Sequence, residues 1–187
     1  MKKICLFFLI IVATGAAAQN KDYVISWEGL GSLKLGMSQA ELEKLLNQKI
    51  KLTNSLDTIN NLYQDTAKLK YKNIPVQLEF ERNYTAPYTF HMRLIGIRAS
   101  SPLCKTTSGI GIGSDKLKII TVYEDYYINI QQGYVSYYET EKGRGKSTIS
   151  IKDDTAYYMI RLFLLNNKVV SFELKADLQG LKSSEEN

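Results

Sequence analysis

The chain opens with a short basic start followed by an apolar run. Lys2 and Lys3 precede residues 4–14, which are almost all apolar, and small residues follow at 15–18. This order of basic, apolar and small residues is typical of a secretory signal peptide. The run is shorter than the roughly 20 residues of a membrane-spanning helix. We therefore predict cleavage before Gln19, no transmembrane segment, and an exported protein of the periplasm or the medium.

Two later segments share one pattern of apolar and polar positions. Residues 33–38 and 110–115 each contain two apolar residues around a variable one, then a glycine and a helix-capping side chain, at an offset of 77. Apolar residues then recur at helical spacing, as on the buried face of an amphipathic helix. The pattern predicts one helix over Gln39–Gln48 and another over Lys116–Tyr126.

The starts of these two predicted helices carry capping signals. Ser38 and Glu41 match a capping box, in which each side chain accepts a hydrogen bond from a backbone N–H group of the first turn. Asp115 takes the cap position of the second helix. Residues 119–122 are mostly β-branched, which lowers the helix propensity of the second segment.

Alternation of apolar and polar residues predicts strands after each helix. Asn166 and Asn167 tolerate the positive φ of a two-residue turn and predict a hairpin between the last two strands. In the last strand, Val170, Phe172 and Leu174 are expected to face the core. The predicted strands are Val76–Phe80, Thr89–Ala99, Thr148–Lys152, Tyr157–Leu165 and Lys168–Ala176.

The order helix, strands, helix, strands predicts an α+β fold with mainly antiparallel sheet. Residues 93–100 and 168–175 align at an offset of 75, close to the offset of the helices. We therefore predict two tandem similar units, each a short capped helix packed on antiparallel strands. The expected organisation is a signal peptide at 1–18, a first unit at 19–100, a second unit at 101–181 and a polar tail at 182–187.

The two cysteines do not form a disulfide framework. Cys5 lies in the apolar run and leaves with the signal peptide, and it stands too early to be a lipoprotein cysteine. Cys104 is then the single thiol of the mature chain. It is expected to be a buried small hydrophobic residue, or alternatively a reactive thiol or an intermolecular disulfide partner.

The mature chain offers few groups for catalysis or metal binding. His91 is its single histidine and lies in a predicted strand, so a conventional nucleophile–base pair is not indicated. Clustered metal-ligating residues are also missing from the sequence. Gly145-Lys146-Ser147 resembles the end of a phosphate-binding loop, but Thr140 stands where that loop requires its first glycine. We expect no catalytic residue, no metal site and no cofactor.

Tyrosine is the unusual residue of this chain, with 13 copies. Tyrosine suits protein interfaces because it combines a large stiff ring with a polar tip, but it also suits ordinary sheet cores. Both interpretations stay open. A basic segment at 141–146 could add a rim contact to an acidic partner. The candidate binding residues are Tyr126, Tyr127, Tyr134, Tyr137, Tyr138, Tyr157, Tyr158 and Arg144.

Three tripeptides resemble the Asp-(Ser/Thr)-aliphatic pattern at which some Gram-negative bacteria O-glycosylate exported proteins. Possible modification sites are therefore Thr58, Thr66 and Thr155.

The segment Leu35–Leu46, with its weaker counterpart Ile112–Tyr123, resembles the helix–sheet unit of the β-lactamase-inhibitor-protein-like superfamily. The small lipoprotein of the outer-membrane barrel assembly machinery has a similar unit, and its Gly-Met-(Ser/Thr) helix start is nearest to Gly36-Met37-Ser38. The chain lacks the lipoprotein cysteine of that protein and the disulfides of the secreted inhibitors. The resemblance implies a binding fold that engages another protein through its sheet.

These observations predict an exported, non-enzymatic binding domain. Its expected partner is a protein of the cell envelope or an extracellular protein, engaged through a tyrosine-rich sheet surface. The formal net charge is +5, of which Lys2 and Lys3 supply two charges, and so we expect no nucleic-acid partner. The alternative is a glycan- or peptidoglycan-binding module, or a small hydrolase of the envelope.

Overall fold

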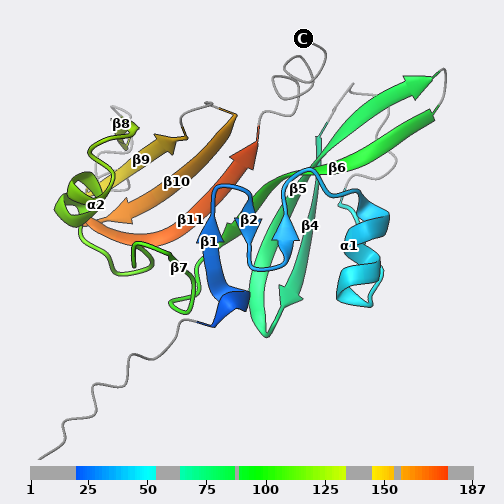
Figure 1. Ribbon diagram of the computed structural model, residues 1–187, viewed down its shortest axis with the longest axis horizontal. Helices are drawn as coiled ribbons and strands as arrows, with labels where there is room; N and C mark the ends of the chain where they lie inside the picture. The colour runs from blue at the N-terminus through cyan, green and yellow to red at the C-terminus, as the bar shows by residue number, and fades with distance from the viewer. Residues whose placement is uncertain (1–19, 54–63, 87–88, 134–144, 154–156, 177–187) are drawn as a thin grey trace, which may run out of the picture.

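The computed structural model describes residues 20–53, 64–86, 89–133, 145–153 and 157–176. These residues form an α+β fold with two α-helices, a four-stranded mixed sheet and a seven-stranded antiparallel sheet (Figure 1). The predicted fold class is confirmed at this level. The predicted signal peptide and polar tail lie outside the described residues.

The seven-stranded sheet, here called the large sheet, has the strand order β4-β5-β6-β11-β10-β9-β8. Every neighbouring pair in it is antiparallel. The strands of the two predicted units meet at the pair β6–β11, the last strand of each unit. The strands are β4 (Gln64–Tyr71), β5 (Ile74–Ala86), β6 (Thr89–Ala99), β8 (Tyr127–Gln132), β9 (Lys146–Lys152), β10 (Tyr158–Leu165) and β11 (Lys168–Ala176).

The small sheet has the order β3-β2-β1-β7 and lies in front of the large sheet in Figure 1. A short 3-10 turn at Lys21–Tyr23 leads into it. Its pair β1–β7 is parallel, and it joins the start of the described chain to the segment that follows β6. The strands are β1 (Val24–Ser26), β2 (Gly29–Leu30), β3 (Leu33–Lys34) and β7 (Lys105–Thr106).

Both predicted helices form but are shorter than the pattern indicated. Helix α1 (Gln39–Leu46) has the predicted capping box at Ser38 and Glu41, and it ends because Asn47 adopts a left-handed conformation with φ 49°. Helix α2 (Lys116–Val122) starts at the predicted cap Asp115. Its predicted extension to Tyr126 is wrong, because the β-branched run gives way to a turn and then to β8.

Each helix start is fixed to the large sheet by the same pair of backbone hydrogen bonds. In each case a glycine N–H donates to a strand carbonyl, and the N–H of that strand residue donates back to the residue after the glycine. The bonds are Gly36 to Leu94 at 2.7 Å and Leu94 to Met37 at 2.8 Å, and Gly113 to Val169 at 2.8 Å and Val169 to Ser114 at 3.0 Å.

The core lies between one face of the large sheet and the layer formed by the helices and the small sheet. Leu42 of α1 and Ile119 of α2 are fully buried there. Phe172 and Leu174 face the core as predicted, but Val170 is 43% exposed. The strand pairing slips by one residue beside Val170, so Val169 takes the inward position instead.

Two tight hairpins connect strands of the large sheet. Asn166 and Asn167 have φ values of 50° and 62°, and the predicted hairpin between β10 and β11 is confirmed. Lys72 and Asn73 form a second such turn between β4 and β5, with φ values of 46° and 69°. The pattern analysis did not predict β4 or β8, although Ala67, Leu69 and Tyr71 of β4 alternate with polar residues.

Candidate functional site

The second face of the large sheet, here called the open face, carries the side chains that alternate with the core residues. Strand register places one complete row of polar residues across all seven strands, and none of the described helices or small-sheet strands lies on that side. Polar residues on one face and core residues on the other are typical of an antiparallel sheet exposed on one side. The row runs through Lys68, Gln77, Arg98, Glu173, Arg161, Ser150 and Asn129.

Two cross-strand ion pairs lie on the open face. Arg161 Nη1 is 2.7 Å from a carboxylate oxygen of Glu173 on the neighbouring strand, which explains how Glu173 can be 9% exposed. Lys175 Nζ is 3.0 Å from the Glu79 carboxylate, although β6 lies between their strands. That contact passes over Gly96. An added Cβ at this position would lie 3.0 Å from Glu79 Cβ, so the absence of a side chain there leaves room for the Lys175–Glu79 pair.

Two further cations lie over aromatic rings. The Arg98 guanidinium carbon is 4.4 Å from the centre of the Phe163 ring. Lys152 Nζ is 5.9 Å from the centre of the Tyr127 ring, and Tyr127 is 64% exposed. Cation–π contacts of this kind hold the charged group in place without neutralising it. Neither Arg98 nor Lys152 forms an ion pair with another described residue.

A cleft with a volume of about 320 Å³ lies beside Arg98 at one end of the open face. It brings a second cation, Lys68, into the same hollow, together with hydroxyl and amide groups. Among the described residues that line it, none is acidic. Its polar lining consists of Lys68, Gln77, Arg98, Ser100 and Ser171.

On the opposite side of the sheet, three aromatic rings form a cluster. Trp27 packs against Tyr123 and Tyr126, with ring centres 6.3 Å and 5.4 Å away, and the two tyrosine rings lie 5.7 Å apart. Burial raises the pKa of Tyr123, and this effect is larger than that of a hydrogen bond from Thr106, which lowers the pKa. The cluster borders a small hollow of about 150 Å³. Tyr126 therefore supports packing between the turn that follows β1 and the turn that follows α2.

The described members of the predicted tyrosine surface do not share one face. Tyr127 lies on the open face, whereas Tyr126 and Tyr158 pack against the core. Tyr157 is half-buried. Burial raises the pKa of Tyr158, and the charges of Glu28 and Asp153 add to the effect. The remaining candidates Tyr134, Tyr137, Tyr138 and Arg144 lie outside the described residues.

Among the three possible glycosylation sites, Thr66 is described. It lies half-buried on β4, and its hydroxyl is 3.4 Å from the hydroxyl of Thr53. Thr58 and Thr155 lie outside the described residues.

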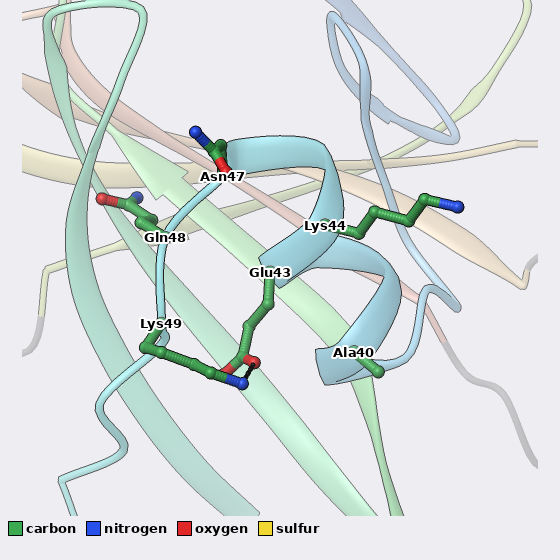
Figure 2. Close-up of a pocket in the computed structure, with 6 residues that line it drawn as sticks. All are labelled: Ala40, Glu43, Lys44, Asn47, Gln48 and Lys49. Atoms are coloured by element: carbon green, nitrogen blue, oxygen red, sulfur yellow. Dashed lines mark hydrogen bonds and ion pairs between the residues drawn. The ribbon is translucent and has the colours of Figure 1, made fainter.

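A hollow of about 530 Å³ lies against the outer side of α1 and the loop that follows it. Figure 2 shows that its side chains diverge, with Lys44 and Asn47 pointing away from Glu43. Glu43 accepts hydrogen bonds from Lys49 Nζ at 2.7 Å and from the Ile50 N–H at 3.0 Å. The Lys49 bond is the largest cause that lowers the pKa of Glu43 to about 2. This arrangement fastens the loop to the helix and brings no reactive groups together.

The remaining candidate groups give no reactive centre in the described part of the chain. Cys104 is fully buried, as predicted, and burial raises the pKa of its thiol to about 11. His91 lies on β6 as predicted. Residues 20–53, 64–86, 89–133, 145–153 and 157–176 contain no cluster of three metal-ligating side chains. Neither described helix has the length and apolar character needed to cross a membrane.

No family model, curated protein or solved structure matches this chain.

Sequence reasoning missed most of the open face. Arg98, Arg161 and Lys152 stand at the polar positions of predicted strands, and this alternation was the signal that could have identified them. Their partners Phe163 and Tyr127 become neighbours only through the order and register of the strands. The candidate site is therefore the open face, with Tyr127 as the residue that it shares with the predicted tyrosine surface.

Proposed function

We propose that this protein is an exported, non-enzymatic binding domain that engages an acidic surface of another protein through its open face. The observation that carries the proposal is the pair of cations Arg98 and Lys152, which lie over Phe163 and Tyr127 and form no ion pair with another described residue. Arginine and aromatic side chains are enriched among the residues that dominate binding energy at protein interfaces. The partner is a protein of the cell envelope or an extracellular protein.

The charges of the open face favour an acidic partner. Glu79 and Glu173 are already paired with Lys175 and Arg161, so they offset two of the positive charges on this face. Arg98 and Lys152 keep their charge, and Lys68 adds a third cation in the cleft. A carboxylate of the partner beside Arg98 would gain a charge-assisted and potentially bidentate hydrogen bond.

We also propose that the two halves are tandem copies of one helix–sheet unit. Gly36 and Gly113 have φ values of 89° and 84°, and each begins the same pair of hydrogen bonds to a strand of the large sheet. These bonds connect positions at the two offsets seen in the sequence, 77 for the helix starts and 75 for the strands. Both helix starts are bonded to the large sheet in the same way, and this supports the duplication of one helix–sheet unit.

The test is capture of partners from the cell envelope by the immobilised mature protein. The double variant Arg98→Glu, Lys152→Glu reverses both charges, and the double variant Lys44→Glu, Lys118→Glu, on the exposed sides of α1 and α2, is the control matched in charge change. We expect one stoichiometric protein partner that the control retains and the double variant loses by at least tenfold. Equal capture by both variants would contradict the proposal. Retention of the wild type on purified peptidoglycan, without a protein partner, would favour a glycan-binding module instead.

Export is tested separately by the intact mass of the protein recovered from outside the cytoplasm. We expect a chain that begins at Gln19 and carries no lipid. A chain that retains Met1, or a diacylated product, would contradict this part of the proposal.

A further inference from the structure

Strand β8 forms one edge of the large sheet, where β9 is its single strand partner among the described residues. Its sequence is Tyr-Ile-Asn-Ile-Gln-Gln, which contains no charge and no proline. Five of its six residues are exposed, including Ile130 at 40%. An exposed, uncharged edge strand is a template for pairing with another strand.

The opposite edge of the same sheet is protected against such pairing. Strand β4 carries exposed Lys68 and Lys70, and charged residues, lysine in particular, are a known way to block edge-to-edge contact. Thr53 also donates its backbone N–H and its hydroxyl to the Thr66 carbonyl of β4, both at 2.9 Å. Among the described residues, neither a charged side chain of β8 nor a second segment protects this edge in that way, so β8 is the better candidate for an interaction surface.

The hydrogen-bond pattern shows which residues of β8 face outward. The Gly133 N–H donates to the Lys146 carbonyl at 2.8 Å, so the odd-numbered positions bond to β9. Because bonded and non-bonded positions alternate along an antiparallel pair, Ile128, Ile130 and Gln132 direct their backbone groups to the free edge. Three N–H groups and three carbonyl groups are thus available to a new strand.

We propose that β8 pairs with β8 of a second copy of this chain, in an antiparallel arrangement centred on Asn129. In this register Ile128 of each copy is opposite Ile130 of the other, and these are the residues with outward backbone groups. The apolar side chains meet on the core side, and Asn129 meets its own copy on the open face. The large sheets of the two copies then form one continuous sheet.

Charge complementarity favours a second copy as the occupant. The uncharged side chains of β8 create no repulsion when the strand meets itself, whereas self-pairing of β4 would place lysines near each other. The antiparallel arrangement also brings Glu124 and Asp125, which precede β8, toward the end of the other copy where Lys146 begins β9. This inference does not depend on the proposed function of the open face.

A disulfide cross-link tests the pairing and its register. Residues opposite each other at a non-bonded position have Cα atoms about 4.5 Å apart, which is within the range that a disulfide can join. We expect Asn129→Cys to form a covalent dimer under mild oxidation, and the exposed control Lys68→Cys to stay monomeric. Cys104 is fully buried and does not interfere.

Sedimentation of the uncross-linked protein provides the second readout. We expect the wild type to show a concentration-dependent dimer and Ile130→Pro, which removes one outward N–H group, to stay monomeric with an unchanged far-UV spectrum. Preferential cross-linking of Ile130→Cys over Asn129→Cys would overturn the proposed register. A wild type that remains monomeric up to about 1 mM, the range of the weakest specific contacts, with no cross-link at Asn129→Cys, would overturn the pairing itself.

Discussion

Cys104 shows how burial decides the chemistry of a single residue. Its thiol is fully buried and has a pKa of about 11, so its thiolate fraction near neutral pH is about a hundredfold below that of an ordinary cysteine. We expect no reaction with Ellman's reagent in the native state at pH 8, and full reaction in denaturant. Rapid native labelling would show that the thiol is accessible and would return Cys104 to the candidate functional residues.

The same residue gives a pH dependence with a defined sign. The folded state holds the Cys104 proton more tightly than the unfolded state, so its contribution to stability is present below pH 9 and is lost as pH rises toward 11. We expect Cys104→Ala to weaken this loss of stability at high pH, measured as the thermal midpoint between pH 8 and 11. An unchanged slope in the variant would contradict the assignment.

Glu43 has the opposite pH behaviour. Its folded pKa lies near 2, chiefly because of the bond from Lys49, so its stabilising effect is present above pH 4.5 and is lost as pH falls toward 2. We expect Glu43→Gln to lower the thermal midpoint at pH 7 and to flatten its decline between pH 4.5 and 2. Glu124→Gln removes the same charge from an exposed position and should leave that decline in place.

At the scale of elements, two glycines hold the helix starts against the sheet. Gly36 and Gly113 have φ values of 89° and 84°, and an added Cβ would meet no atom within 4 Å at either position. The cost of alanine there is therefore conformational, about 1–2 kcal/mol at each position. We expect Gly36→Ala and Gly113→Ala to lower the free energy of unfolding in urea by similar amounts.

Three further variants extend this comparison. Asparagine tolerates positive φ better than alanine, so Gly36→Asn and Gly113→Asn should recover part of the loss. Lys44→Ala on the exposed side of α1 should change stability by less than about 0.5 kcal/mol. A large loss at one glycine and none at the other would contradict the equivalence of the two helix starts.

The elements also show what the sequence could predict. Local signals were sufficient for the capping box at Ser38, the Asn166–Asn167 hairpin and the bounds of β6 and β11, because each depends on residues close together in the chain. The exposure of Val170 was not predictable, since it depends on a one-residue slip against β10. The site was less predictable than the fold, because Arg98 and Phe163 meet only after β6 and β11 pair.

At the scale of the whole molecule, the two halves share both sheets. Strand β1 pairs with β2 on one side and with β7 on the other, which joins the start of the chain to the second half. In the large sheet, Leu174 of β11 is opposite Ile97 of β6, and both are fully buried. The described residues are therefore expected to unfold in one cooperative transition, as is usual for domains of this size.

Trp27 is the single tryptophan and reports directly on this cooperativity. Its ring packs on Tyr123 and Tyr126, so its fluorescence follows the contact between the small sheet and the second half. We expect the Trp27 fluorescence transition to coincide with the far-UV circular dichroism transition in urea. Leu174→Ala at the junction should lower the free energy of unfolding by about 2–5 kcal/mol, with the same value from both transitions. Val170→Ala, at an exposed position of the same strand, should lower it by less than about 1 kcal/mol. Because Leu174 lies far from Trp27 in sequence but in the same continuous structure, two separate transitions would show that the halves fold independently despite their shared sheets.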